Sequence, residues 1–167
     1  TNPIARNNTY TATEDTQLTG NMITDATADS DSNGDSLVLL SINDKSFTVG
    51  TAITLNHGYL TITNTNGAFS YDPFGNDTLG DSFDYTISDG RGGFATASVT
   101  IAVTAVNDAP IARGNTYATA INTILTGRNL ILDVDSTDGQ DTDVETITSS
   151  LSISAINGTV FSSLNNS

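Results

Sequence analysis

Residues 94–106 read Phe-Ala-Thr-Ala-Ser-Val-Thr-Ile-Ala-Val-Thr-Ala-Val, and this stretch indicates the fold class most directly. Val99, Ile101 and Val103 occupy every second position, with threonine or alanine between them. An apolar residue at every second position is typical of a β-strand that has one buried face and one face toward water. The stretch is therefore predicted to be a long strand in a sheet that packs on one side.

Strand signals extend over the first two thirds of the chain. Short runs rich in Thr, Val, Ile, Tyr and Phe are separated by clusters of Gly, Asn and Asp, and no long segment has helical periodicity. Many short strands with turns between them indicate an all-β sandwich. The predicted strands are Ala5–Thr11, Ser36–Asn43, Ser46–Val49, Tyr59–Thr63, Ala68–Tyr71, Ser82–Ser88 and Phe94–Val106.

An internal repeat defines the domain organisation. Residues 3–20 read PIARNNTYTATEDTQLTG, and residues 110–127 read PIARGNTYATAINTILTG. The offset from Pro3 to Pro110 is 107 residues, about the length of one β-sandwich domain. We therefore predict one complete repeat over 1–106, a linker over 107–110, and an incomplete second repeat over 111–167.

The second copy is expected to be weak by itself. It covers little more than half of the period, and the later segment FDYTISDG of the first copy has no counterpart in it. Half a sandwich exposes its inner face and the edges of its strands. The second copy is thus predicted to be unstable alone, swapped, or completed by a partner.

The charge of the chain excludes several classes of partner. Asp and Glu number 19 against 5 Lys and Arg, which gives a formal net charge of −14. Such a chain repels nucleic acid and anionic membranes, and no apolar run approaches the roughly 20 residues that span a bilayer. Cysteine is absent, so disulfides and thiol chemistry are excluded. We predict no nucleic-acid partner and no direct membrane insertion.

The first acidic cluster lies at residues 25–35. Alternate acids and a Gly turn allow several oxygens to converge, as Ca²⁺ with its six to eight oxygen ligands requires. An EF-hand is rejected because no acid lies near the twelfth position of the loop. The alternative interpretation is a solvated polar turn, since Asp, Asn and Gly are ordinary turn residues. The candidate ligands are Asp25, Asp29, Asp31, Asn33 and Asp35.

Two further acidic groups are candidate parts of metal sites. Residues 133–143 of the second copy hold an acidic loop, from which we take Asp133 and Asp135 as candidates. Dispersed residues form the third group, and they could serve only if their oxygens met at a domain junction. The alternative is that each one is a cap or turn residue. The dispersed candidates are Glu14, Asp15, Asp89, Asn107 and Asp108.

The order of several motifs carries a family resemblance. The motifs are Glu-Asp-Thr at 14–16, the loop DSDSNGDSL at 29–37, GAFSYDP at 67–73, DSFDYTISDGRGG at 81–93 and VNDAP at 106–110. In this order they resemble the bacterial cadherin-like tandem repeats, which include the Ig-like and VCBS-type repeats of large RTX adhesins. The resemblance covers residues 1–109 and the opening of the next repeat.

The resemblance implies a fold, a location and a role. It implies a Greek-key β-sandwich, exported to a bacterial cell surface or secreted, that serves as a rigid extender or adhesion module next to further repeats. The linker at 107–110 is similar to the cadherin linker, so Asn107 and Asp108 are implied as Ca²⁺ ligands. Glu14 would join them from one domain, and Asp133 with Asp135 from the next.

An enzymatic function is not expected. His57 is the only histidine, lies in a predicted hairpin turn, and has no nucleophile or second base grouped with it. The alternative function is a polysaccharide-binding module that accompanies a secreted enzyme. That function needs exposed aromatic rings, for which the candidates are Tyr10, Tyr59, Phe69, Tyr71, Phe74 and Phe161.

Overall fold

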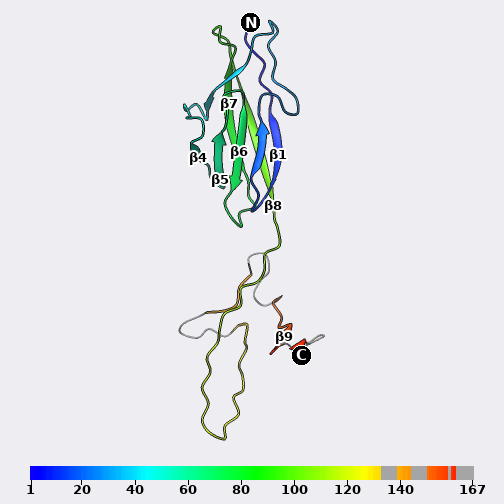
Figure 1. Ribbon diagram of the computed structural model, residues 1–167, viewed down its shortest axis with the longest axis vertical. Coiled ribbons are helices and arrows are strands. Elements are labelled where there is room, and N and C mark those ends of the chain that lie inside the picture. The colour runs from blue at the N-terminus through cyan, green and yellow to red at the C-terminus, as the bar shows by residue number, and fades with distance from the viewer. Residues whose placement is uncertain (133–138, 144–149, 158, 161–167) are drawn as a thin grey trace. The chain divides into compact units, whose positions relative to one another are not determined.

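The computed structural model describes residues 1–132, 139–143, 150–157 and 159–160 (Figure 1). The chain divides into two compact units, Thr1–Val106 and Asn107–Ser167. Each unit is described by itself. Within the described residues no helix is long and apolar enough to cross a membrane.

The first unit is an all-β sandwich, as the sequence predicts, and it has eight strands where seven were predicted. Most of the strands lie within two or three residues of the predicted bounds. The strands are β1 Asn8–Thr13, β2 Leu18–Asn21, β3 Val38–Ile42, β4 Ala52–Thr54, β5 Gly58–Ile62, β6 Ala68–Pro73, β7 Asp81–Ser88 and β8 Phe94–Thr104.

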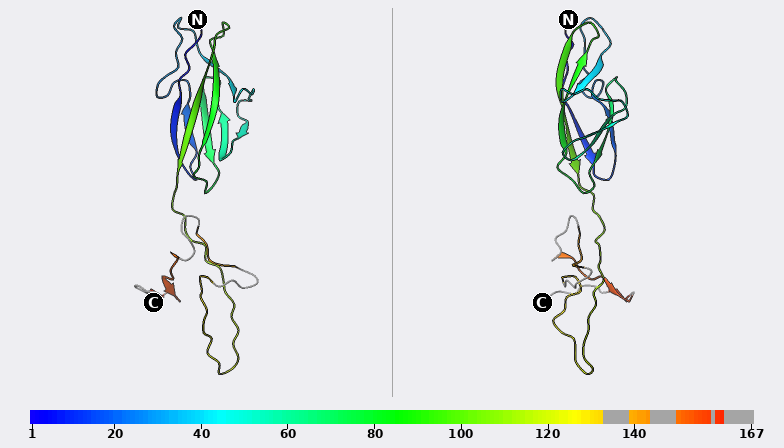
Figure 2. Two further views of the ribbon diagram at one scale, coloured as in Figure 1. Left: turned by 180° about the vertical axis from the view of Figure 1, so that it is seen from behind. Right: turned by 90° about the vertical axis from the view of Figure 1, so that its left-hand side faces the viewer.

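The eight strands form two four-stranded sheets, which the two views of Figure 2 show as separate layers. One sheet has the order β1-β8-β7-β3 and the other the order β2-β6-β5-β4. In the second sheet, β2 lies beside β6 after a long connection through the first sheet, which is the Greek-key pattern. All pairs in these sheets are antiparallel except β1 with β8, which run parallel from Asn8↔Val99 to Thr13↔Thr104.

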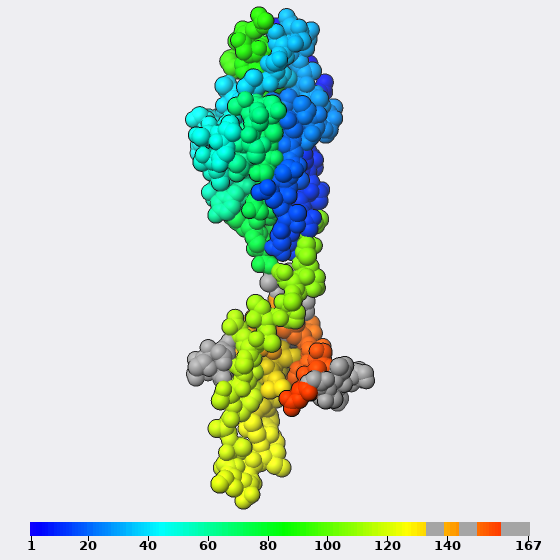
Figure 3. All heavy atoms as spheres, viewed as in Figure 1, coloured from blue at the N-terminus to red at the C-terminus, as the bar shows by residue number. Residues whose placement is uncertain are grey.

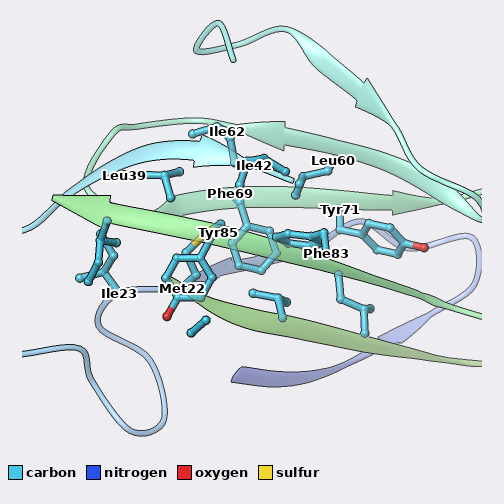
Figure 4. Packing of buried hydrophobic residues seen from close by; sticks show 14 of the residues in the cluster. Met22, Ile23, Leu39, Ile42, Leu60, Ile62, Phe69, Tyr71, Phe83 and Tyr85 are labelled. Atoms are coloured by element: carbon cyan, nitrogen blue, oxygen red, sulfur yellow. The ribbon is translucent and has the colours of Figure 1, made fainter. Parts of the chain in front are cut away.

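The core lies between the two sheets and consists of their inward-facing residues. Phe83, Tyr85 and Ile87 of β7 are at most 2 % exposed, as the period-two pattern predicts. Figure 4 shows the rings of Phe83 and Tyr85 beside that of Phe69, which comes from β6 of the opposite sheet. The core fixes β7 and β8 side by side, and the turn between them therefore has a defined position at one end of the unit.

Three strands depart from the sequence prediction. No strand forms at residues 46–49, because the chain turns there: Thr51 N donates to Thr48 O at 3.0 Å, and Gly50 has φ of 80°. The chain then enters β4, which was not predicted. Strand β2 was not predicted, and it contains Gly20, a residue that is depleted in strands. A Cβ on Gly20 would lie 2.8 Å from the Tyr10 ring, so the packing requires glycine there.

In the second unit the described strands are β9, Ala155–Ile156, and β10, Thr159–Val160, which pair antiparallel. The sixteen buried hydrophobic residues of the core all lie in the first unit. Among the described residues of the second unit, Ile121 and Ile124 are 91 % and 85 % exposed. This part of the chain therefore lacks the apolar packing that holds the first unit together.

Candidate metal centre

Three carboxylates converge at the end of the first unit where the chain begins. Asp31 and Asp35 lie in the long loop after β2, and Asp89 lies in the turn between β7 and β8. One oxygen from each lies within 4.8 Å of the others. Figure 3 shows the two segments in contact at this end, the loop in blue and the turn in green. The sandwich thus brings together acids that are more than fifty positions apart.

The β7–β8 turn is built around the carboxylate of Asp89, which is 7 % exposed. Its Oδ1 accepts hydrogen bonds from the backbone N–H groups of Arg91 and Gly93, each at 2.8 Å. These two donors hold the pKa of Asp89 below its usual range, since they stabilise the ionised form. A Cβ on Gly93 would lie 2.2 Å from Asp89 Oδ2, so glycine is required there. Asp89 is therefore a fixed negative charge.

Asp31 has one oxygen in use and one without a partner. Its Oδ1 accepts from the backbone N of Asn33 at 2.7 Å, and Gly34 N donates to the Asp31 carbonyl at 3.1 Å. Its Oδ2 is buried and has no hydrogen-bond partner. A buried carboxylate oxygen without a partner costs free energy unless a cation or donor satisfies it. With Asp35 and Asp89 beside it, the oxygen set fits a hard cation such as Ca²⁺.

Asp35 is engaged by a side chain. Arg91 Nε donates to Asp35 Oδ1 at 2.8 Å, and this is one of two ion pairs among the described residues. The Asp35 side chain is 18 % exposed, whereas that of Arg91 is 75 % exposed. Arg91 was not among the predicted site residues. Its contact with Asp35 spans 56 positions, so no local pattern could have revealed it.

The other acids of the predicted first cluster serve the fold. Asp29 is buried, and its carboxylate accepts from Arg6 N at 2.7 Å and from the Tyr85 hydroxyl at 2.9 and 3.0 Å. Burial raises the pKa of Asp29. Asp25 Oδ2 accepts from Asn21 N at 2.6 Å and from the Tyr10 hydroxyl at 3.2 Å. Asp25 and Asp29 lie outside the group of three carboxylates.

Asn33 lies in the same loop but faces the start of the chain. Its Oδ1 accepts from the Thr1 hydroxyl at 2.5 Å, and that hydroxyl also lies 2.5 Å from Ser32 Oγ. The residues that precede the first strand therefore rest on the candidate loop.

The dispersed group of predicted ligands is divided between the two ends of the unit. Glu14 lies at the end of β1, where its N–H donates to Thr104 O at 3.0 Å and its carboxylate accepts from Val106 N. Asp89 lies before the other end of β8, and an eleven-residue strand separates the two by roughly 33 Å. The two carboxylates cannot share an ion within this unit.

The remaining junction residues lie on the Glu14 side. Asp15 is exposed, with φ of 60°, in the turn after β1. Asn107 Nδ2 donates to the Asp108 carbonyl at 2.9 Å. Neither Asp15 nor the pair at 107–108 belongs to a group of three metal-ligating side chains within the described part of the chain.

The second copy repeats the local framework of the first around its acidic loop. Asn129 Oδ1 accepts from Ile131 N and Leu132 N at 2.9 and 3.0 Å, as Asn21 Oδ1 accepts from Ile23 N and Thr24 N at 3.0 and 3.1 Å. These contacts align residues 129–132 with residues 21–24. The sequence then places Asp133, which lies outside the described residues, at the position of Asp25.

A second set of contacts aligns the end of that loop. Arg113 N donates to Asp141 Oδ1 at 2.6 Å, as Arg6 N donates to Asp29 Oδ1 at 2.7 Å. Asp141 therefore corresponds to Asp29, and Asp143 to Asp31. The predicted Asp135 lies outside the described residues, in a segment that is longer than its counterpart in the first copy. Sequence reasoning missed Asp143 because the extra residues shift the register of the two loops.

The aromatic candidates for sugar binding differ in their exposure, and the histidine lies in a turn. Phe69 and Tyr71 belong to the core, whereas Tyr59 is 45 % exposed and packs edge-on against Phe74 with ring centroids 4.9 Å apart. His57 lies in the turn before β5, and its Nδ1 is 2.7 Å from Asp77 Oδ2. Tyr10 is partly buried, and Phe161 lies outside the described residues.

Comparison with known proteins bears on the first unit. No curated protein matches the chain. Solved structures similar to it include the endo-fucoidan hydrolase MfFcnA4 of glycoside hydrolase family 107 and its H294Q variant, at 20 % and 21 % identity. A nucleoside hydrolase-related protein from Saccharophagus degradans is 13 % identical. Each alignment covers 62 % of this chain with a TM-score of 0.39, and the chain spans 14 %, 14 % and 26 % of those proteins.

A family model assigns the chain more directly. The model of the bacterial cadherin-like domain matches residues 1–105, which is the first unit almost from end to end. The match agrees with the two-sheet sandwich and with the order of the motifs at its turns. The chain therefore belongs to the family of bacterial cadherin-like domains.

Proposed function

We propose that the chain is a calcium-binding extension module of a bacterial surface or secreted protein, with Asp31, Asp35 and Asp89 as the side-chain ligands. One observation carries the proposal: three carboxylates meet, and one of their oxygens, Asp31 Oδ2, is buried without a partner. Backbone carbonyls and water would complete the oxygen ligands that Ca²⁺ requires.

The function of such a site is structural. A bound Ca²⁺ supplies two positive charges among three carboxylates that otherwise repel one another. The loop of Asp31 and Asp35 has no regular secondary structure, whereas Asp89 is fixed on the β7–β8 turn by two backbone donors. A shared ion would fasten the loop to that turn. Because Thr1 contacts Asn33 of this loop, the site would also stiffen the segment that leads into β1.

Neighbouring repeats of the same protein are the proposed partners. Glu14, Asn107 and Asp108 lie where the first unit passes into the second, and we propose them as junction residues that act separately from the three carboxylates. Surface adhesion is the corresponding cellular role. The function we propose is structural and assigns no catalytic role to any residue.

The polysaccharide-binding alternative is favoured by exposed rings, of which Tyr59 also packs against Phe74. The other exposed ring of the first unit, Phe94, lies in the other sheet, so each ring offers a sugar a single stacking surface. The three carboxylates have no part in that function. Calcium-dependent extension therefore accounts for more of the described features.

The proposal is tested by thermal unfolding of the first unit in EDTA and in 10 mM Ca²⁺. With a Kd of about 0.1 mM, as in extracellular modules, the ion adds about 2.7 kcal/mol. For a domain of this size the Tm should rise by roughly 10–20 °C. Asp31→Asn should abolish most of this rise, whereas Asp72→Asn, an exposed charge on β6, should retain it. Equal melting curves with and without Ca²⁺ would contradict the proposal.

A further inference from the structure

The candidate centre already contains a cationic side chain. Arg91 Nε lies 2.8 Å from Asp35 Oδ1, and no other guanidinium or ammonium group is ion-paired to the three carboxylates in the part of the chain that the structure describes. Only one guanidinium nitrogen makes the contact. It satisfies Asp35 but leaves Asp31 Oδ2 without a partner. Arg91 therefore neutralises the cluster only in part.

The backbone under Arg91 does not depend on its side chain. Asp89 Oδ1 holds the turn through the N–H groups of Arg91 and Gly93. On both sides of Arg91 the turn is open, because a Cβ on Gly90 or Gly92 would meet nothing within 4 Å. The Arg91 side chain is 75 % exposed, and among the described residues its hydrogen bond to Asp35 is the one polar contact found for it. The side chain can leave while the turn and Asp89 stay in place.

We propose that Arg91 is an internal competitor for the cation at the Asp31–Asp35–Asp89 centre: its guanidinium pairs with Asp35 in the ion-free state and is displaced when Ca²⁺ binds. This inference rests on the proposed calcium function and names the residue that sets the affinity of the site. A divalent ion on Asp35 and a guanidinium at the same oxygen would repel each other, so the two occupy it in turn.

The consequence for affinity follows from the competition. When only a fraction of the protein is in the state that can bind the ion, the apparent affinity for the ion falls by that fraction. Exposed pairs of this kind shift an equilibrium by a factor of about 1.4 to 5. The positive charge of Arg91 also repels Ca²⁺ at the site, which weakens binding further. Arg91 should therefore weaken Ca²⁺ binding about three- to tenfold compared with a neutral side chain at the same position.

The test is Ca²⁺ titration by calorimetry on the full 167-residue chain in about 0.1 M salt. Arg91→Gln removes the competitor and should tighten Kd about three- to tenfold. Lys45→Gln is the matched control, because it makes the same change in net charge at an exposed position in the turn after β3. Its effect should stay below about 1.5-fold, since an exposed charge is screened beyond about 10 Å.

A double-mutant cycle shows whether Arg91 acts through Asp35. In an Asp35→Asn background, Arg91→Gln should change Kd less than about twofold, because Arg91 has lost its partner. The Nε–H signal of Arg91 in NMR spectra should also move toward its free-solvent position as Ca²⁺ is added. A structural role in the turn alone would not produce this movement.

The outcomes separate this inference from the proposed function. If neither the natural chain nor Arg91→Gln binds Ca²⁺, both proposals fail. If the natural chain binds but Arg91→Gln has an unchanged or weaker affinity, the calcium site stands and the competitor is refuted. Tighter binding by Arg91→Gln than by Lys45→Gln, lost in the Asp35→Asn background, supports it.

Discussion

Asp29 and Asp89 are both buried carboxylates, yet their surroundings shift the pKa in opposite directions. The backbone donors at Asp89 outweigh its loss of water, whereas burial dominates at Asp29. Asp89 therefore contributes stability that is present above its unfolded pKa of about 3.9 and is lost as the pH falls through its lower folded value. For Asp29 the pH dependence is opposite. Its contribution to stability falls as the pH rises through its raised folded pKa.

The variant Asp29→Asn tests the direction in which the contribution of Asp29 to stability changes with pH. An amide oxygen can still accept from Arg6 N and Tyr85, but it carries no charge that burial penalises. We expect the stability of Asp29→Asn relative to the natural chain to increase as the pH rises from 3 to 7, measured by urea unfolding in EDTA. Asp72→Asn is the control with an exposed carboxylate. A difference that stays constant across this range would show that burial does not govern Asp29.

Residue by residue, the sequence predicted the acidic loop but not the selection within it. Asp29, Asp31 and Asp35 look equivalent as alternate acids in one loop. The fold assigns Asp29 to Tyr85 and leaves the other two to meet Asp89. That selection depends on which strands lie side by side, and spacing within the loop contains no information about it. Asp89 was predicted as a candidate, but with the junction residues at the other end.

Among the elements, β1 and β8 end together at Glu14. The side chain of Glu14 is 1 % exposed and accepts from Val106 N, the last residue of the first unit. The counterpart of Glu14 in the second copy is Ile121, which cannot accept a hydrogen bond. The side-chain hydrogen bond that joins the ends of β1 and β8 in the first copy therefore cannot form at Ile121 in the second.

Glu14→Ala should destabilise the first unit by about 1.5–3 kcal/mol, because it removes a buried hydrogen bond to a charged group. Urea unfolding measures the loss, and hydrogen exchange should show reduced protection of the Val106 amide. Glu14→Gln keeps an acceptor and should lose less. Equal losses in the two variants would mean that the packing of the side chain matters more than its hydrogen bond.

Strong period-two patterns predicted their elements well. The pattern of β7 is clear because its buried positions hold Phe83, Tyr85 and Ile87. Strand β2 was not predicted because it contains Gly20, and the ring that requires glycine there, that of Tyr10, comes from another strand. The missing strand at 46–49 has a similar cause. Residues 46–49 have side chains that favour a strand, but they lie in the connection that passes through the turn at Gly50 from β3 in one sheet to β4 in the other. Local preference yields to contacts that form only in the folded domain.

In the molecule as a whole, all sixteen core residues lie in the first unit. A chain that ends at Asp108 keeps this core and the Glu14–Val106 contact. We expect its Tm in EDTA to match that of the first unit in the full chain within about 2 °C, measured by calorimetry. A larger decrease would show that the second unit stabilises the first. The 107-residue repeat predicted two copies, but sequence similarity alone could not show that the described core would belong to one of them.

The parallel pairing of β1 with β8 has a mechanical consequence. β1 is the first strand of the unit and β8 the last, so a pull on the two ends of the unit draws these neighbours in opposite directions along their length. The load falls in shear on the whole ladder from Asn8↔Val99 to Thr13↔Thr104, and its hydrogen bonds must fail together rather than one after another. In a tethered chain under flow, this pair would bear the tension.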